Sequence, residues 1–556
     1  MPPRTHLTRR AQLAAPIAIA AALSPIAPAQ HLTLGSAPDR VARTDGQLDP
    51  GPSDLTTPLW VFPASDPTVA GPIAWIKDAG PVVANDLVIA VSGADTSGTP
   101  ARMWAVRRED GSLAWSADLP NQLFDSWTTP TIDRVNRTVL YATGRPGADA
   151  GVVQARRLTD GHLLWETALD KDVVNATVLV TTNRAGRDRA FVTDYEGFYA
   201  GGDGATLYCI NLDPYLNRHD PDGYPPDNPY QPGEIVWRVP LQSGASGATP
   251  AYDGRDVYLA TAGDFDFAAG GAVLAFHAGA TDAANALAWR SDTAGDNGFF
   301  GGVAVHDGAV FAATYNYNAG TSSARLLKLD ASDGSLLWST PSNRTDSIPI
   351  PLDDGRIVLS TGIPGYGSAP TVQVFQDLGS SAALIDDSAH ATWHDDGDGL
   401  LEPGEFDVLG GWTHQPCVVD HHPLTGAPVL FVGSIDVPAA GQFSRGYTRL
   451  SMIDLTRGFA DPTCVLSTFD GAGSSPAIVQ RSLYTIGADG LYAFGLPYAL
   501  DVNADGRTDL DDLYAWYQPV PNRDVNRDAL VNADDARALQ AELRRHEQED
   551  ANGGRP

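Results

Sequence analysis

Two acidic stretches near the C-terminus hold the residues whose types and spacing point most directly to chemistry. They read DVNADGRTDLDD from residue 501 and DVNRDALVNADD from residue 524. Each places oxygen-bearing side chains at loop positions 1, 3, 5, 9 and 12, and a backbone carbonyl at position 7 completes a ligand set for calcium. The candidate calcium ligands are Asp501, Asn503, Asp505, Arg507, Asp509 and Asp512 in the first loop, and Asp524, Asn526, Asp528, Leu530, Asn532 and Asp535 in the second.

The two loops differ at position 6, where the chain bends sharply. Gly506 suits this bend, whereas Ala529 replaces the glycine in the second loop, so we expect the second site to bind calcium more weakly. A helix-like run follows each loop, at 513–517 and 536–545. An acidic, solvated tail is the alternative interpretation of this segment.

The tandem loops resemble a type I dockerin. The resemblance implies a small α-helical, EF-hand-like domain over 498–548, ordered by calcium and bound to a cohesin-like protein, with a disordered tail at 549–556. The sequence departs from the family pattern in two ways: the loop starts, 501 and 524, lie close together, and Thr508 stands where a hydrophobic residue is usual. These departures weaken the expectation of a cohesin partner more than the expectation of calcium.

A third acidic loop, HDDGDGLLEPGEF at 394–406, offers a further candidate cation site. Around Gly399, positions 3, 5, 9 and 12 are filled by Asp396, Asp398, Glu402 and Glu405. His394 would stand at position 1, where calcium loops use an oxygen ligand. An acidic surface loop without a cation is the alternative.

Most of the remaining chain repeats one hairpin. The copies read MWAVRREDGSLAW from residue 103, VQARRLTDGHLLW from 153 and LLKLDASDGSLLW from 326, and in each a Trp follows the turn glycine by four residues. Apolar runs on both sides of Asp-Gly predict a β-hairpin, because glycine accepts the positive φ of a tight turn. Three copies with one internal spacing indicate a repeat architecture.

The repeat period predicts a β-propeller over 54–497. The outer Trp positions 115, 165, 237, 289 and 338 are separated by 50, 72, 52 and 49 residues, and a proline-rich insertion at 213–234 explains the longest interval. Four strands per roughly 50 residues is the period of a propeller blade. The repeat openings number about eight, with seven blades as the alternative. Two later units have no Trp in register. In the second of them, Val465 or Leu466 stands where the Trp is expected.

The two ends of the repeat region complement each other. The stretch 58–63 is a lone strand containing Trp60, and the last strand pair ends at 491–497 without a further strand. We therefore predict that the N-terminal strand becomes the outer strand of the last blade. Such closure leaves only short blade edges exposed.

These units resemble the propeller repeat of pyrroloquinoline-quinone (PQQ) proteins. The resemblance rests on the strand, glycine turn and outer Trp from Ala105 to Trp115 and from Ala155 to Trp165, with Lys328 replacing the alanine before Trp338. In that family the Trp side chains dock neighbouring blades, which implies a core role here. The resemblance also implies the activity of a PQQ-dependent dehydrogenase. Such enzymes often have adjacent cysteines, an aspartate base and calcium held by Glu and Asn. This sequence has no adjacent cysteines, and the other parts do not align.

The composition limits the partners. Charged residues make up 19% of the chain, and its net charge of -31 repels nucleic acid and anionic membrane surfaces. The three cysteines, Cys209, Cys417 and Cys464, are too scattered for a zinc motif or a disulfide framework. Two alternatives remain for them: a disulfide bond between Cys417 and Cys464, or three buried thiols.

Residues 1–29 have the pattern of an export signal. Arg4, Arg9 and Arg10 precede an apolar stretch, and small residues up to Ala29 offer a cleavage site. Prolines interrupt the stretch, so we expect no integral membrane span. Both the general and the twin-arginine routes are open, and the mature chain is expected to be secreted, at the cell surface or periplasmic. Residues 30–53 are interpreted as a linker.

No motif assigns a catalytic residue. The dense titratable cluster of the repeat region is Asp420, His421 and His422, which we expect at a solvent-exposed turn. The leading hypothesis is an exported propeller that binds or scaffolds protein or glycan and is docked through the dockerin-like module. A PQQ-dependent oxidoreductase and a dockerin-bearing enzyme of polysaccharide degradation are the alternatives.

Overall fold

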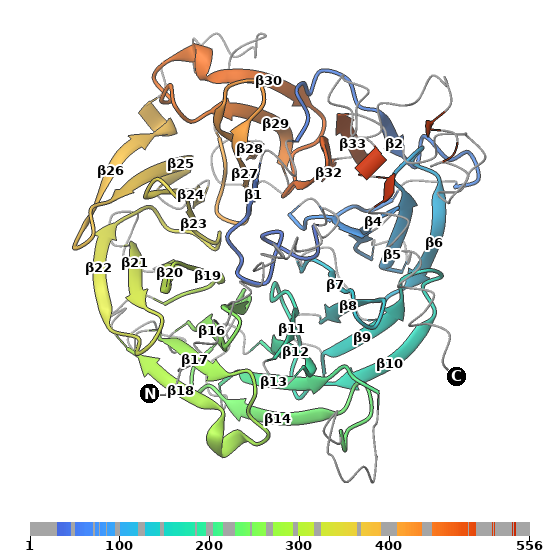
Figure 1. Cartoon of the computed structure of the whole chain (residues 1–556), viewed down its shortest axis with the longest axis vertical. Helices are drawn as coiled ribbons and strands as arrows, with labels where there is room; N and C mark the ends of the chain where they lie inside the picture. Colours follow the sequence, from blue (N-terminus) through green and yellow to red (C-terminus); the bar gives the residue numbers. More distant parts are fainter. Residues whose placement is uncertain are drawn as a thin grey trace, which may run out of the picture. The chain divides into compact units, whose positions relative to one another are not determined.

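Eight β-sheets surround a central axis in the part of the chain that the structure describes (Figure 1). The structure is a computed structural model. It describes residues 514, 516, 517, 536, 537, 539 and 540, and residues 31–495 apart from 46–50, 70–72, 77, 85, 95–99, 121–127, 145–149, 184–185, 196–203, 215–227, 245–246, 263–270, 293–297, 316–323, 364–367, 391–408, 436–446 and 488. The predicted eight-bladed propeller of four-stranded blades is confirmed, and seven blades are excluded.

Blades 1 to 4 follow the chain in order, each with its first strand nearest the axis. Their elements are β3 (Val82–Ala84), β4 (Leu87–Ser92), β5 (Arg102–Arg107), β6 (Leu113–Asp118); β7 (Thr131–Asp133), β8 (Thr138–Thr143), β9 (Val152–Arg157), β10 (Leu163–Ala168); β11 (Leu179–Thr182), β12 (Asp188–Thr193), β13 (Thr206–Asn211), β14 (Ile235–Pro240); and β15 (Ala251–Tyr252), β16 (Asp256–Ala260), β17 (Val273–His277), η1 (Ala283–Asn285), β18 (Leu287–Ser291).

Blades 5 to 8 complete the ring. Their elements are β19 (Val303–His306), β20 (Ala309–Ala313), β21 (Arg325–Asp330), β22 (Leu336–Pro341); β23 (Ile350–Pro351), β24 (Arg356–Ile363), β25 (Ser368–Asp377), β26 (Ala382–Asp387), η3 (Ser388–His390); β1 (Arg43–Asp45), β27 (Cys417–His422), β28 (Ala427–Ile435), β29 (Tyr447–Asp454), η4 (Pro462–Cys464), β30 (Val465–Asp470); and β31 (Ala477–Val479), β32 (Ser482–Ile486), β33 (Leu491–Gly495), β2 (Trp60–Phe62).

The N-terminal strand closes the ring. β2 is the outer strand of blade 8 and pairs antiparallel with β33, with Trp60 opposite Ala493 and Phe62 opposite Leu491. Both aromatic residues lie in the core between blades 8 and 1, together with Trp104. The predicted closure is confirmed.

The repeated Trp side chains fix neighbouring blades to each other. Indole N–H groups donate to oxygen atoms in the next blade: Trp115 to the Leu158 carbonyl at 2.8 Å, Trp289 to the Ala331 carbonyl at 3.0 Å, and Trp338 to the Asp377 carboxylate at 3.0 Å. The turn glycine has to be small, because a Cβ on Gly161 would come within 2.4 Å of the Trp115 ring. Gly161 also has a φ of 70°, which favours glycine. The Trp residues therefore hold the blades together, as expected.

The two blades without this Trp use a polar residue at the same register. In blade 6 the carboxylate of Asp386 accepts a hydrogen bond from the Phe459 backbone N–H of blade 7 at 2.8 Å. In blade 7 the position belongs to Ser467, opposite Met452. The expectation of Val465 or Leu466 is wrong, because the connection between β29 and β30 is lengthened by η4, and the bulge that the Trp blades also have then puts Ser467 at the Trp register.

The predicted α-helical, dockerin-like domain at 498–548 is wrong. The elements of the described residues are strands and short 3-10 helices, with no α-helix among them, although single residues such as Tyr514 and Trp516 have helical backbone. The spacing of acidic residues specifies ligands rather than helices, and helices as short as the expected runs are marginal without packing. A search of the described helices also finds none long and apolar enough to cross a membrane.

Candidate functional site

The predicted calcium ligands lie outside the described residues. This holds for the twelve positions from Asp501 to Asp535 and for Asp396, Asp398, Glu402 and Glu405 of the third loop. Calcium at these positions stays a prediction. In the described part of the chain, no group of three or more His, Cys, Asp or Glu side chains is placed to hold a metal ion.

The cluster at the end of β27 is structural. His422 is buried, against the expectation of a solvent-exposed turn, and only His421 is exposed. The His422 ring contacts the Pro52 carbonyl oxygen through Nε2 at 3.2 Å, and its Nδ1 accepts from the Leu424 N–H at 3.3 Å. Burial lowers the pKa of His422, and the contact with Pro52 opposes this. Asp420 lies 3.1 Å from the Arg43 guanidinium. Asp420 and His422 are therefore each held by a separate local partner.

The three cysteines are buried, free thiols. Cys417 lies on the inner strand β27, and Cys464 precedes the outer strand β30 of the same blade. Two strands separate these positions, so the disulfide alternative is excluded and three buried thiols are confirmed.

Residues 31–45, which we call the central segment, run through the middle of the ring (Figure 1). Backbone N–H groups of the inner strands donate to its carbonyl oxygens: Ile132 to Leu32, Tyr252 to Pro38 and Val418 to Ala42, at 2.8, 2.8 and 3.0 Å. At its end β1 adds in parallel to β27. These residues belong to the stretch interpreted as a linker, and in the structure they connect blades 2, 4 and 7.

Arg40 anchors the central segment and has 0% exposure. Its guanidinium donates to the carbonyl oxygens of Leu34, Pro250 and Val178 at 2.7, 2.9 and 3.1 Å, and to the Thr33 hydroxyl. Burial lowers the pKa of Arg40 to about 9, while the neighbouring Asp39 favours the charged form. One buried cation therefore joins the central segment to the neighbouring blades 3 and 4.

A small cavity lies beside the central segment in the described part of the chain. The cavity between it and the first inner residues of blades 1, 2, 7 and 8 measures about 10 Å³, which is about the room that one water needs. Side-chain hydroxyls border this region and join consecutive blades. Thr129, Thr177 and Thr249 accept in turn from the N–H groups of Gly80, Thr129 and Thr177, at 3.1, 3.2 and 3.0 Å.

A second buried polar group lies at the loops that enter blades 6 and 7. The hydroxyls of Tyr447 and Thr413 are 3.0 Å apart, and Thr413 donates to Asp78 at 3.1 Å. His414 Nε2 accepts from the Gly433 N–H at 2.7 Å, and burial lowers the pKa of His414 to about 3. Burial also raises the pKa of Asp346 well above its usual range. Sequence reasoning missed these residues because Asp346, Thr413 and Tyr447 lie far apart in the sequence and form no motif.

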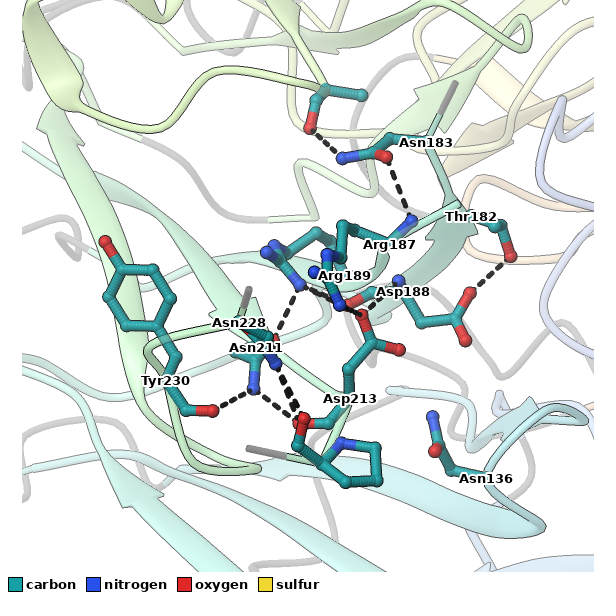
Figure 2. A network of polar contacts seen from close by, with 12 residues as sticks. Asn136, Thr182, Asn183, Arg187, Asp188, Arg189, Asn211, Asp213, Asn228 and Tyr230 are labelled. Carbon is teal, nitrogen blue, oxygen red and sulfur yellow. Dashed lines mark hydrogen bonds and ion pairs between the residues drawn. The ribbon is translucent and has the colours of Figure 1, made fainter. Parts of the chain in front are cut away.

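A buried charged network lies between blades 2 and 3, where β7 ends, β12 begins and β13 ends (Figure 2). Asp213, the first residue of the proline-rich insertion, accepts from the Asp188 N–H at 3.1 Å. Its carboxylate lies 3.6 Å from Arg189 and 3.8 Å from Arg187. Arg189 donates in addition to Asn211 at 2.6 Å.

Two asparagines fix both ends of the insertion. Asn211 donates to the carbonyl oxygens of Asp213 and Tyr230 at 2.7 and 3.2 Å (Figure 2). Asn228 donates to that of Pro214 at 3.0 Å. The insertion therefore leaves the blade from a rigid base.

The network contains three aspartates, Asp133, Asp188 and Asp213, and two arginines, Arg187 and Arg189. The pKa values of two of its aspartates are raised. Burial raises the pKa of Asp188 to about 6; the hydrogen bond from Thr182 opposes this rise, and the charges of Asp133 and Asp213 add to it. Burial likewise raises the pKa of Asp133, against a hydrogen bond from Asn136. Asp188 therefore changes its charge near pH 6.

Replacing Asp188 with asparagine is expected to flatten the pH dependence of stability between about pH 4 and pH 6. The folded chain keeps the Asp188 proton up to about pH 6, whereas an unfolded aspartate releases it near pH 4. The folded state therefore loses stability as the pH rises through this window. Urea unfolding at a series of pH values measures the slope, with exposed Asp333→Asn as the control. Equal slopes for wild type and Asp188→Asn would contradict this prediction.

Comparison with protein families matches residues 57–213 and 270–399 to the family described as outer membrane protein assembly factor BamB. The matched residues make up more than half of the chain. This chain belongs to the BamB family. The resemblance to the PQQ-type propeller repeat is confirmed for the repeat and for the fold. No curated protein matches this BamB-family chain significantly.

Solved structures with this fold have low sequence identity to the BamB-family chain. A europium-containing methanol dehydrogenase has 11% identity and a TM-score of 0.52, covering 93% of this chain and 97% of its own. BamB from Moraxella catarrhalis has 14% identity and a TM-score of 0.46, covering 76% and 98%. A quinohemoprotein alcohol dehydrogenase from Comamonas testosteroni has 12% identity and a TM-score of 0.49, covering 84% and 77%. At such identity, likeness to the methanol dehydrogenase shows the fold alone.

The described residues of this BamB-family propeller do not fit the PQQ site that the resemblance implies. The three cysteines lie in separate cores, so none can form an adjacent pair. No described cluster of carboxylates is placed to hold the calcium ion. The central segment also takes up the middle of the ring.

Proposed function

We propose that this BamB-family propeller is an exported scaffold that binds another protein on its outer surface. The observation that carries the proposal is the central segment. Its residues, anchored by fully buried Arg40, leave a cavity of only about 10 Å³ beside them. Such a ring offers its outer wall, rather than its channel, to a partner. The export pattern of residues 1–29 fits this role.

The outer wall of blades 5 and 6 is the surface best suited to a partner. Its exposed apolar side chains are Leu336, Leu337, Leu378, Leu384 and Ile385, with exposures from 39% to 62%. β22 and β26 are the outermost strands of their sheets among the described elements, so their outer backbone groups can pair with another strand. We expect an extended segment of a partner protein to add here. The net charge of -31 favours a basic segment.

Replacing both Leu337 and Ile385 with aspartate is expected to abolish partner capture, because two charges would stand on the apolar wall. Leu164→Asp is the matched control, since Leu164 precedes Trp165 on β10 as Leu337 precedes Trp338 on β22. The measurement is affinity capture from the envelope and secreted fractions of the source cells. A protein retained by wild type and by Leu164→Asp, but lost by the double variant, supports the proposal. Identical captured sets for all three chains contradict it.

A quinone-dependent enzyme is the competing outcome. In a titration of the purified chain with PQQ and calcium, we expect no saturable change in absorbance and no dye reduction with alcohols or sugars. Stoichiometric PQQ binding with turnover would overturn the scaffold proposal.

A further inference from the structure

A pocket of about 200 Å³ lies where blades 7 and 8 meet the stretch that leads from the central segment to β2. Its lining comes from distant parts of the chain: Gly51, Ser53, Asp54 and Thr57 before β2, His422 and Pro423 after β27, Arg481 between β31 and β32, and Gly495 at the end of β33. Pockets for drug-sized ligands are larger. This volume therefore suits one side chain or a small organic acid.

Arg481 supplies a positive charge to the pocket. In the described structure its guanidinium makes no hydrogen bond or ion pair, whereas Arg238 on β14 lies 2.6 Å from Asp170. A shortage of acids does not explain this, because the chain has a net charge of -31. Asp54 lines the same pocket, but its carboxylate accepts hydrogen bonds from Thr56 and from Ser467. The planar guanidinium is suited to binding a carboxylate through two parallel hydrogen bonds.

The backbone that presents Arg481 is strained. Gln480 and Arg481 have φ values of 46° and 60° and form the two-residue turn between Val479 and Ser482. Such a turn favours Asn-Gly, because both central residues have a positive φ. Larger residues in this conformation cost free energy and gather at functional sites. The turn thus fixes the backbone at Arg481, as the β7–β8 turn does at Arg137 with a φ of 53°, and it places the Arg481 side chain at the lining of the pocket.

The pocket is also held in a fixed shape. Gly495 lies so close to the turn that a Cβ on it would come within 2.0 Å of the Arg481 carbonyl oxygen. On the opposite wall, His422 is buried and tied to the Pro52 carbonyl oxygen. Because burial lowers the pKa of His422, this wall adds no charge at neutral pH. A ligand therefore meets a site that needs little rearrangement, which favours binding.

We propose that this pocket binds a carboxylate through the Arg481 guanidinium, with the hydroxyls of Ser53 and Thr57 as further hydrogen-bonding groups. The carboxylate belongs either to a small organic acid or to an acidic residue of a bound protein. This site is separate from the outer wall of blades 5 and 6, so it does not depend on the proposed function.

The test is isothermal titration of the full-length chain with N-acetyl-glutamate and with a short amidated peptide containing one glutamate. The corresponding glutamine compounds are the neutral controls. We expect saturable binding of a glutamate compound that weakens with added salt, and a loss of about tenfold or more in affinity for Arg481→Ala. Asp54→Asn should tighten binding, because it removes a like charge from the pocket. Tighter binding of the small acid identifies a free metabolite, and tighter binding of the peptide identifies a protein side chain.

Arg481→Gly separates binding from folding. This variant relieves the positive φ, so we expect an equal or higher Tm together with the loss of carboxylate binding. Arg137→Gly is the matched control, since Arg137 has a φ of 53° in the β7–β8 turn of blade 2. It should relieve similar strain and keep the binding. Unchanged affinity in Arg481→Ala, equal binding of the glutamine compounds, or no binding of either glutamate compound would overturn the proposal.

Discussion

Replacing Trp60 with alanine is expected to destabilise the ring by about 3 to 5 kcal/mol, as removal of a buried aromatic side chain does. Its indole N–H donates to the Arg108 carbonyl oxygen of blade 1 at 3.0 Å, and its ring lies 5.8 Å from that of Tyr484. The seam that Trp60 holds has a special position. The chain runs from β2 directly into blade 1, whereas the pairing of β2 with β33 joins the two opposite ends of the propeller within blade 8.

Trp115→Ala is the matched control for this seam. Trp115 is 7% exposed, as Trp60 is, and it makes the equivalent hydrogen bond to blade 2. We expect Trp60→Ala to speed amide hydrogen exchange in β2 and β31–β33, and Trp115→Ala to leave exchange in these strands unchanged. Calorimetry gives the accompanying change in Tm. Unaltered exchange in β31–β33 of Trp60→Ala would show that the ring does not depend on this strand for closure.

Replacing Arg40 with alanine is expected to cost about 3 to 5 kcal/mol and to release the central segment. The substitution removes the donors of Leu34 and Pro250 and leaves a cavity at the axis. The Val178 carbonyl oxygen is affected less, because it also accepts from the Thr131 hydroxyl at 2.7 Å. Buried acceptors without a donor lose their hydration and gain nothing in return, which is the source of the cost.

Arg40→Met separates the charge from the volume. Methionine fills much of the same space and avoids the burial of a cation, so we expect its loss of stability to be smaller than that of Arg40→Ala. Limited proteolysis at residues 31–45, followed by mass spectrometry, reports release of the segment. If Arg40→Ala is as resistant to cleavage as wild type, Arg40 does not anchor the segment.

The sequence predicted the blades because their determinants are local. An Asp-Gly turn, two apolar runs and a Trp four residues after the glycine specify a hairpin and its docking surface, as at Gly161 and Trp165. Repetition every 50 residues or so then made the ring and its closing strand predictable. The same kind of local reasoning failed for the helical domain, because acidic spacing specifies possible ligands without specifying the packing that stabilises helices.

The interior and the candidate sites were decided by the tertiary structure. Nothing in the local sequence of Arg40 shows that it lies beside Val178 and Pro250, and the network around Asp213 joins turns of two blades. In the pocket, Ser53 precedes His422 and Arg481 by hundreds of residues along the chain. Hydrophobic periodicity determines which face of a strand is buried. Closing eight blades into one ring determines which distant polar groups meet, and that depends on the whole chain at once.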